Sequence, residues 1–291
     1  MSTIILFGAS GATGSFLLPQ LLARGATVHA VSRRPPAAAA PAPIWVTGDL
    51  FGTLDGLPEA ADVALSLGPL DAFAAWIEHA QLPRLSRVVA LSSMSANSKR
   101  DSIDRGEREL AARLRQAEAR LLRFTAARGI ACTLLRPTLI YGGRTDQSLT
   151  PIVVFARRWR ILPIPLGARG LRQPIHTADL AAAVLAVIDC AAAAGKTYAL
   201  GGGERLPFNA MLFRLRAAVT GPVLPLPVPQ RWLRALLSLR GGENRPSSGA
   251  LQRLNEDLIA DNEEARRDFG FSPRPFAAGD VVTPRMVAEN S

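Results

Sequence analysis

The chain has few of the residues that build disulfide frameworks or metal centres. It contains two cysteines and three histidines among 291 residues. Cys132 lies in an apolar pattern and Cys190 ends an alanine-rich stretch, so both are expected to be small core residues. The histidines are scattered, and no metal-ligand spacing occurs among them. Neither a disulfide scaffold nor a metal site is therefore expected.

Long apolar runs are missing as well. No stretch approaches the roughly 20 uninterrupted apolar residues of a membrane-spanning helix. The first residues lack the charged and apolar regions of a signal peptide. A cytoplasmic protein without a transmembrane segment is the expectation. One basic amphipathic run, Gln230 to Arg240, could rest on a membrane surface or pack its apolar face inside the protein.

Acidic residues are outnumbered by basic ones, 24 to 34, which gives a formal net charge of +10. The basic residues are spread through predicted helices such as residues 107–128, where acidic residues lie between them. That distribution is typical of solvated helix faces, and no zinc-finger, RNP or helix-turn-helix motif accompanies it. We therefore expect no nucleic-acid partner, and we interpret the charge as attracting an anionic cofactor and small-molecule substrate.

A glycine-rich loop directly follows the first short apolar run. Its glycines have the spacing of a dinucleotide-binding turn between a strand and a helix. The first permits the tight turn, the second lets a pyrophosphate approach, and the third lets the helix pack on the sheet. The N–H groups at the start of that helix would then face the anion. The predicted contacts in this loop are Gly8, Ser10, Gly11, Ala12, Thr13 and Gly14.

The end of the second predicted strand indicates which dinucleotide binds. An NAD site usually has an acidic residue there for the ribose 2′-hydroxyl, but this chain has Arg33 and Arg34. Two guanidinium groups can bind an additional 2′-phosphate, so NADP(H) is favoured over NAD(H). A solvated basic loop is the alternative. After the third strand, Asp49 could accept a hydrogen bond from the adenine amino group or simply cap a turn.

Apolar strand patterns alternate with helix patterns along the first 200 residues. This alternation predicts an α/β fold with a doubly wound parallel (Rossmann) sheet, whose ligands bind beyond the carboxyl ends of the strands. The expected division is a Rossmann domain over residues 1–200, with a cap insertion at about 143–173, and a smaller α/β substrate-cap region over 201–291. Further cofactor contacts predicted at strand ends are Leu50, Ser66, Leu67, Ser92, Pro137 and Thr138.

Four motifs follow one another in a familiar order: residues 8–14, 91–93, 135–142 and 174–181. Together they resemble the extended or atypical short-chain dehydrogenase/reductases of the NAD(P)-dependent epimerase/dehydratase kind. The resemblance implies an oxidoreductase or epimerase (an isomerase) that acts on a nucleotide-sugar-like anionic substrate. It also implies a possible homodimer through helices such as the apolar stripe at 110–122, although the protein's own sheet could equally cover that stripe.

The chain differs from this family at the catalytic pair of residues. Its members usually have a Tyr followed four residues later by a Lys, which lowers the pKa of the phenol so that it can transfer a proton. This chain has two tyrosines, Tyr141 and Tyr198, and neither is followed by Lys at that spacing. Alignment on Glu118 puts Leu110 and Leu114 in the two positions.

Other residues must then do the chemistry if any is done. Candidates are Ser92 and Ser93, which could polarise a carbonyl, and Tyr141, for which packing or substrate contact is the alternative. Arg169 and Arg172 in the cap are candidate substrate ligands, with solvated loop charges as the alternative. The competing hypotheses are a catalytically silent dinucleotide-binding sensor or assembly subunit, and a basic surface-binding protein whose nucleotide site is structural.

Overall fold

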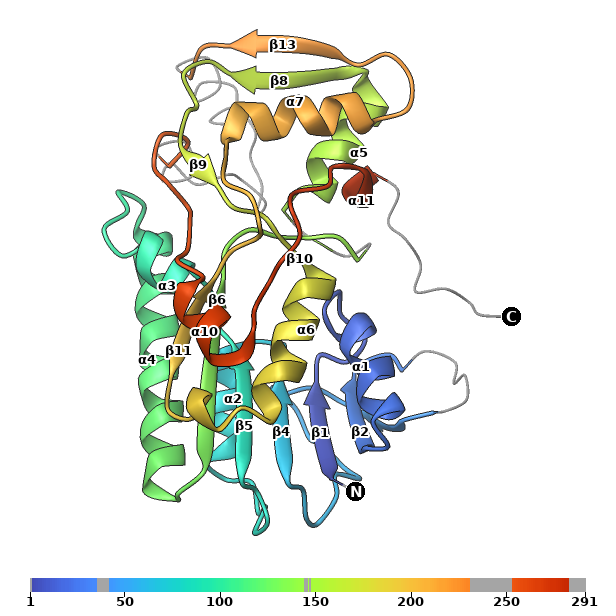
Figure 1. Ribbon diagram of the computed structural model, residues 1–291, viewed down its shortest axis with the longest axis vertical. Helices are drawn as coiled ribbons and strands as arrows, with labels where there is room; N and C mark the ends of the chain where they lie inside the picture. Colours follow the sequence, from blue (N-terminus) through green and yellow to red (C-terminus); the bar gives the residue numbers. More distant parts are fainter. Residues whose placement is uncertain (1, 36–41, 144–145, 147, 231–252, 283–291) are drawn as a thin grey trace.

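The central element of the fold is a sheet of seven parallel strands in the order β11-β6-β5-β4-β1-β2-β3 (Figure 1). The computed structural model describes residues 2–35, 42–143, 146, 148–230 and 253–282. The winding reverses between β1 and β4, which is where doubly wound sheets bind ligands. The sheet confirms the predicted α/β class. Its strands are β1 (Thr3–Phe7), β2 (Thr27–Ser32), β3 (Ile44–Thr47), β4 (Val63–Ser66), β5 (Arg87–Leu91), β6 (Ala131–Pro137) and β11 (Thr197–Leu200).

Helices cover both faces of this sheet. Alternate residues of a strand point to opposite faces, so Ile4 and Leu6 pack towards α1 and α6, whereas Ile5 and Phe7 pack towards α2 and α4. Burial on both faces explains why the strands are continuously apolar. The helices around the sheet are α1 (Gly14–Ala23), α2 (Leu70–Ile77), α3 (Ser95–Ser98), α4 (Arg105–Ala127) and α6 (Thr177–Ile188), with a 3-10 turn at Ala191–Ala193.

A smaller region with its own apolar core lies above the carboxyl ends of the strands in Figure 1. β8 pairs in parallel with β13, so the predicted cap insertion and a segment about 60 residues later form one unit. Two short pairs join this unit to the sheet, β7 with β10 and β9 with β12. The elements are β7 (Ile140–Tyr141), α5 (Thr150–Trp159), β8 (Ile161–Pro165), β9 (Leu171–Arg172), β10 (Ile175–His176), β12 (Leu206–Pro207), α7 (Phe208–Ala218), β13 (Leu224–Val228) and α11 (Gly279–Val282).

The chain after residue 201 contributes to both regions. α10 (Glu263–Phe269) returns to the main sheet, where Ala265 joins the core beside α6. The Asp268 carboxylate accepts hydrogen bonds of 2.6 Å from both Lys196 and Tyr198, at the start of β11. The predicted division at residue 201 therefore does not follow the packing.

The sequence raised two expectations about membranes, one about spanning helices and one about a basic amphipathic run. In the ranges that the structure describes, no helix combines the length and apolar character needed to cross a bilayer. The basic amphipathic run from Gln230 to Arg240 lies outside the described residues, apart from Gln230 itself.

Candidate dinucleotide-binding site

The glycine loop joins β1 to α1 in the conformation that its spacing predicts. Gly8 has a φ of 79°, a left-handed conformation that favours glycine. A Cβ atom on Gly14 would lie 2.3 Å from the Gly8 carbonyl oxygen, so the start of α1 packs on the loop with no room for a side chain. A Cβ on Gly11 would meet one atom, at 3.2 Å, which leaves this side of the loop open.

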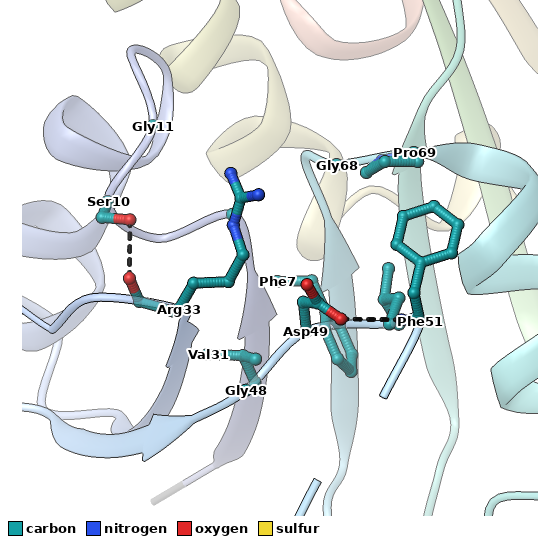
Figure 2. A pocket seen from close by; sticks show the side chains of 13 residues that line it. Phe7, Ser10, Gly11, Val31, Arg33, Gly48, Asp49, Phe51, Gly68 and Pro69 are labelled. Carbon is teal, nitrogen blue, oxygen red and sulfur yellow. Dashed lines mark hydrogen bonds between the residues drawn. The ribbon is translucent and has the colours of Figure 1, made fainter. Parts of the chain in front are cut away.

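A cavity of about 280 Å³ opens beside this loop, between the ends of β1, β2, β3 and β4 (Figure 2). Six predicted residues line it: Gly8, Ser10, Gly11, Arg33, Asp49 and Leu50. Prediction missed seven others: Phe7, Val31, Ser32, Gly48, Phe51, Gly68 and Pro69. At the end of β4, Gly68 and Pro69 line the cavity, whereas the predicted residues Ser66 and Leu67 do not.

Two arginines bring unneutralised charge to the cavity. Figure 2 shows the Arg33 side chain extending into it, and Arg34 lines an adjoining cavity of about 430 Å³ with Ser10, Ser32 and Arg33. Both side chains are exposed, and neither guanidinium forms a hydrogen bond or ion pair with any described residue. The Ser32 hydroxyl lies 2.8 Å from that of Ser10 and accepts a hydrogen bond of 3.2 Å from the Arg34 amide. These contacts hold the end of β2 against the glycine loop.

The loop residues also fit a pyrophosphate. The amide N–H groups of Ala12 and Thr13 have no acceptor among the described residues, and they precede the ten-residue helix α1. Unpaired N–H groups and the positive end of the helix dipole attract an anion at this position. Because Gly11 has no side chain, a pyrophosphate can approach these amides closely. Such a set of donors is typical of a dinucleotide site.

Asp49 both caps a turn and lines the cavity, so its two predicted roles are compatible. Its Oδ1 accepts a hydrogen bond of 2.9 Å from the Phe51 amide, as a turn-capping Asp does. The carboxylate also lies at the cavity wall in Figure 2, within the site rather than behind it.

Two side chains predicted as cofactor contacts point elsewhere. Ser66 is fully buried, and its hydroxyl has no hydrogen-bond partner among the described residues. The Thr138 hydroxyl donates to the Gln173 carbonyl oxygen, and the Thr138 amide donates to the Leu200 carbonyl oxygen. Neither Pro137 nor Thr138 lines the cavity beside the glycine loop. The side chains of Ser66 and Thr138 are therefore turned into the protein interior, away from this cavity.

The two candidate serines, which follow β5, have different hydrogen-bond partners. The Ser92 hydroxyl donates to Oε1 of Glu118 at 2.5 Å, and Arg136 binds the same carboxylate through Nε at 2.7 Å. This hydrogen bond raises the pKa of the Arg136 guanidinium. The Ser93 hydroxyl accepts a bond of 3.1 Å from the Ser95 amide, which leaves its own proton available to donate. The Ser92 hydroxyl is hydrogen-bonded to an ion pair, whereas the Ser93 hydroxyl donates to no described residue.

Tyr141 was predicted as a catalytic or substrate-binding residue, and its surroundings contradict both roles. The residue is fully buried in the core of the smaller region, beside His176 and Phe276. Its hydroxyl accepts a hydrogen bond of 3.1 Å from the Ala277 amide. Burial raises the pKa of its phenol to about 12, the opposite of what a proton donor at neutral pH needs.

Replacement of Tyr141 by Phe tests this correction. We expect Y141F to lose about 1 kcal/mol of unfolding free energy in urea titrations, because the Ala277 amide loses its acceptor. Dinucleotide affinity and any NADPH oxidation by the protein should not change. A variant of unchanged stability that has lost such turnover would restore Tyr141 as a proton donor.

The two arginines predicted to bind substrate also differ. Arg172 is 7% exposed and donates to the carbonyl oxygens of Leu171, Arg253 and Glu256. Burial lowers the pKa of its guanidinium. Its hydrogen bonds hold the segment at 253–256 in place, so the buried side chain is not available to a substrate. Arg169 is exposed and keeps the predicted role as a proposal.

Comparison with known proteins identifies the family of this chain. A sequence model of the NAD(P)H-binding family matches residues 8–191. A 2-alkyl-3-oxoalkanoate reductase of Stenotrophomonas maltophilia is 32% identical over 171 residues, which are 54% of this chain and 51% of that protein. The mitochondrial NADH dehydrogenase [ubiquinone] 1 alpha subcomplex subunit 9 of Arabidopsis thaliana is 36% identical over 73 residues, 25% of this chain and 18% of that one. The chain thus spans about half the length of the reductase and about a fifth of that of the NADH dehydrogenase subunit.

Solved structures show the same fold over almost the whole chain. The epimerase Mth375 of Methanothermobacter thermautotrophicus superposes with a TM-score of 0.75 at 17% identity, covering 97% of this chain and 90% of that one. This likeness extends to the smaller region as well as the central sheet.

Proposed function

Because the chain belongs to the NAD(P)H-binding family, whose match covers residues 8–191, we propose that it binds NADP(H) in the cavity beside the glycine loop. The amides of Ala12 and Thr13 would hold the pyrophosphate, and Arg33 and Arg34 would hold the 2′-phosphate. The adenine would lie near Asp49 and Phe51. When bound, a nicotinamide dinucleotide supplies a hydride donor or acceptor.

The observation that carries the proposal is the pair of free guanidinium groups at the end of β2. An acidic residue there would repel a 2′-phosphate, whereas Arg33 and Arg34 present two cations without an acidic partner among the described residues. Charge-assisted, bidentate hydrogen bonds from arginine to phosphate are among the strongest that proteins make.

Calorimetric titration with NADPH and NADH tests this function directly. We expect NADPH to bind at least about tenfold more tightly, and added salt to weaken NADPH binding more than NADH binding, because the 2′-phosphate adds charge. Equal affinities, or a preference for NADH, would show that the arginines do not read the 2′-phosphate.

We further propose that the protein holds the dinucleotide without a tyrosine–lysine proton relay. Tyr141 is buried, and the Tyr198 hydroxyl donates a hydrogen bond to Asp268. Burial is the main cause that raises the pKa of Tyr198. Lys196 binds the same carboxylate. These surroundings support the hypothesis of a catalytically silent binding protein, a sensor or an assembly subunit.

Hydride transfer to an anionic carbonyl substrate is the second candidate. The Ser93 hydroxyl favours it, because its proton has no acceptor among the described residues. The reductase among the relatives supports the same reaction class. Stopped-flow oxidation of NADPH with a panel of carbonyl acids and nucleotide sugars separates the two. Turnover that S93A removes without loss of NADPH affinity would favour the enzyme, and absence of turnover would favour the silent binder.

A further inference from the structure

The smaller region carries an apolar sheet face that is exposed at the end where β8 and β13 begin. The two strands pair in register, so Ile161 and Pro163 share this face with Leu224 and Leu226, whereas Pro165 at its far end is buried. The other face, with Leu162 and Ile164, packs into the core of the smaller region. Figure 1 shows these two strands above α7, at the end of the molecule farthest from the central sheet. On the outer face Leu224 is 67% exposed and Leu226 47%.

The outer edge of β13 cannot readily pair with another strand. The Leu224 amide donates to the Arg160 carbonyl oxygen, and the Val228 carbonyl accepts from the Leu166 amide, so these groups of β13 point towards β8. By alternation, Pro225 and Pro227 would supply the donors on the outer edge, and proline has none. A partner must therefore bind through the apolar side chains and not through the backbone.

The charge around the face points to an anionic partner. In the segments that carry it, Arg157, Arg158, Arg160 and Arg169 are exposed. Arg172 is buried and Arg214 is paired with Glu204, so these two do not add free charge. Arg160 and Arg216 are fixed at the Leu224 end, because they donate to the carbonyl oxygens of Thr220 and Val223. Arg158 lies over the exposed ring of Trp159, 5.7 Å from its centre.

These features together favour a lipid surface. Two copies of this face, packed together, would bring like charges into contact, which opposes self-association. A bilayer with anionic headgroups offers both an apolar layer for the leucines and negative charge for the arginines. We propose that the outer face of β8 and β13 docks on the surface of an anionic membrane, with Leu224 and Leu226 entering the interface.

Co-sedimentation of the full chain with lipid vesicles tests the proposal. We expect binding to vesicles of equal parts phosphatidylcholine and phosphatidylglycerol, little binding to phosphatidylcholine alone, and weakening by salt. The double variant L224S/L226S should lower the partition coefficient at least about tenfold, because it removes apolar contacts without changing charge. The matched control is I103S, since Ile103 is 63% exposed but lies just before α4, outside this face.

NADPH titration of each variant checks that the fold is intact, and the single variant L224S replaces the double variant if the latter does not fold. The proposal fails if wild type does not bind the anionic vesicles, binds neutral vesicles equally well, or binds them unchanged after the leucine substitutions. It also fails if light scattering shows a dimer that L224S/L226S dissociates, because a second copy would then be the occupant.

Discussion

The double variant R33A/R34A is expected to lose most of its affinity for NADPH while its affinity for NADH stays the same. Both guanidinium groups are exposed beside the cavity, and neither is held by a described acidic residue. Loss of two charge-assisted hydrogen bonds costs about 3 kcal/mol in total, which corresponds to about a 100-fold rise in the Kd for NADPH. Parallel calorimetric titrations with the two dinucleotides measure the effect.

The matched control for this variant is R105A, because Arg105 is an exposed arginine paired with Glu109 at the start of α4. It removes one surface charge far from the cavity, and we expect both affinities to stay within about twofold of wild type. A double variant that loses NADPH and NADH binding equally would assign the arginines to the shared pyrophosphate. Unchanged NADPH affinity would refute the assignment to NADP(H).

The second large effect is expected from Gly14. The Cβ atom of G14A would lie 2.3 Å from the Gly8 oxygen, 2.4 Å from the Ala9 oxygen and 2.6 Å from the Ala9 carbonyl carbon. All three are backbone atoms that cannot rotate away, so the loop and the start of α1 must separate. Overpacking of this kind costs about 1–3 kcal/mol of unfolding free energy. Because the displaced loop carries the amides of Ala12 and Thr13, binding of both dinucleotides should be lost as well.

Two further glycine variants make this prediction sharp. The Cβ of G11A would meet one atom at 3.2 Å but would project at the cavity wall, so we expect near-normal stability with weakened dinucleotide binding. G279A has nothing within 4 Å and should change neither property. Thermal unfolding and calorimetry on the three proteins separate the packing role from the binding role. Equal behaviour of G14A and G279A would contradict the packing role of Gly14.

How much of the candidate site could be predicted depended on how local the signal was. The glycine spacing, Arg33 and Asp49 each lie at the end of a strand whose apolar pattern is clear, and the structure brings all of them to one cavity. Phe51 gave no such signal, because an exposed phenylalanine in a loop has no periodic pattern that marks it.

Tyr141, Arg172 and Ser92 show where that reasoning stops. Each is a reactive or charged residue near a strand end, and each is committed to a partner distant in the sequence. Tyr141 meets Ala277, Arg172 meets the backbone of 253–256, and Ser92 meets Glu118. No local pattern encodes such contacts.

The sequence by itself determined the parallel α/β sheet, the glycine loop after β1 and the paired arginines after β2, because hydrophobic periodicity and residue spacing act over neighbouring residues. Only the tertiary structure decided which polar side chains remain free for a ligand and which apolar face is left open. Those outcomes depend on which distant segments fill the space around a side chain, as when β13 pairs with β8 and exposes Leu224 and Leu226.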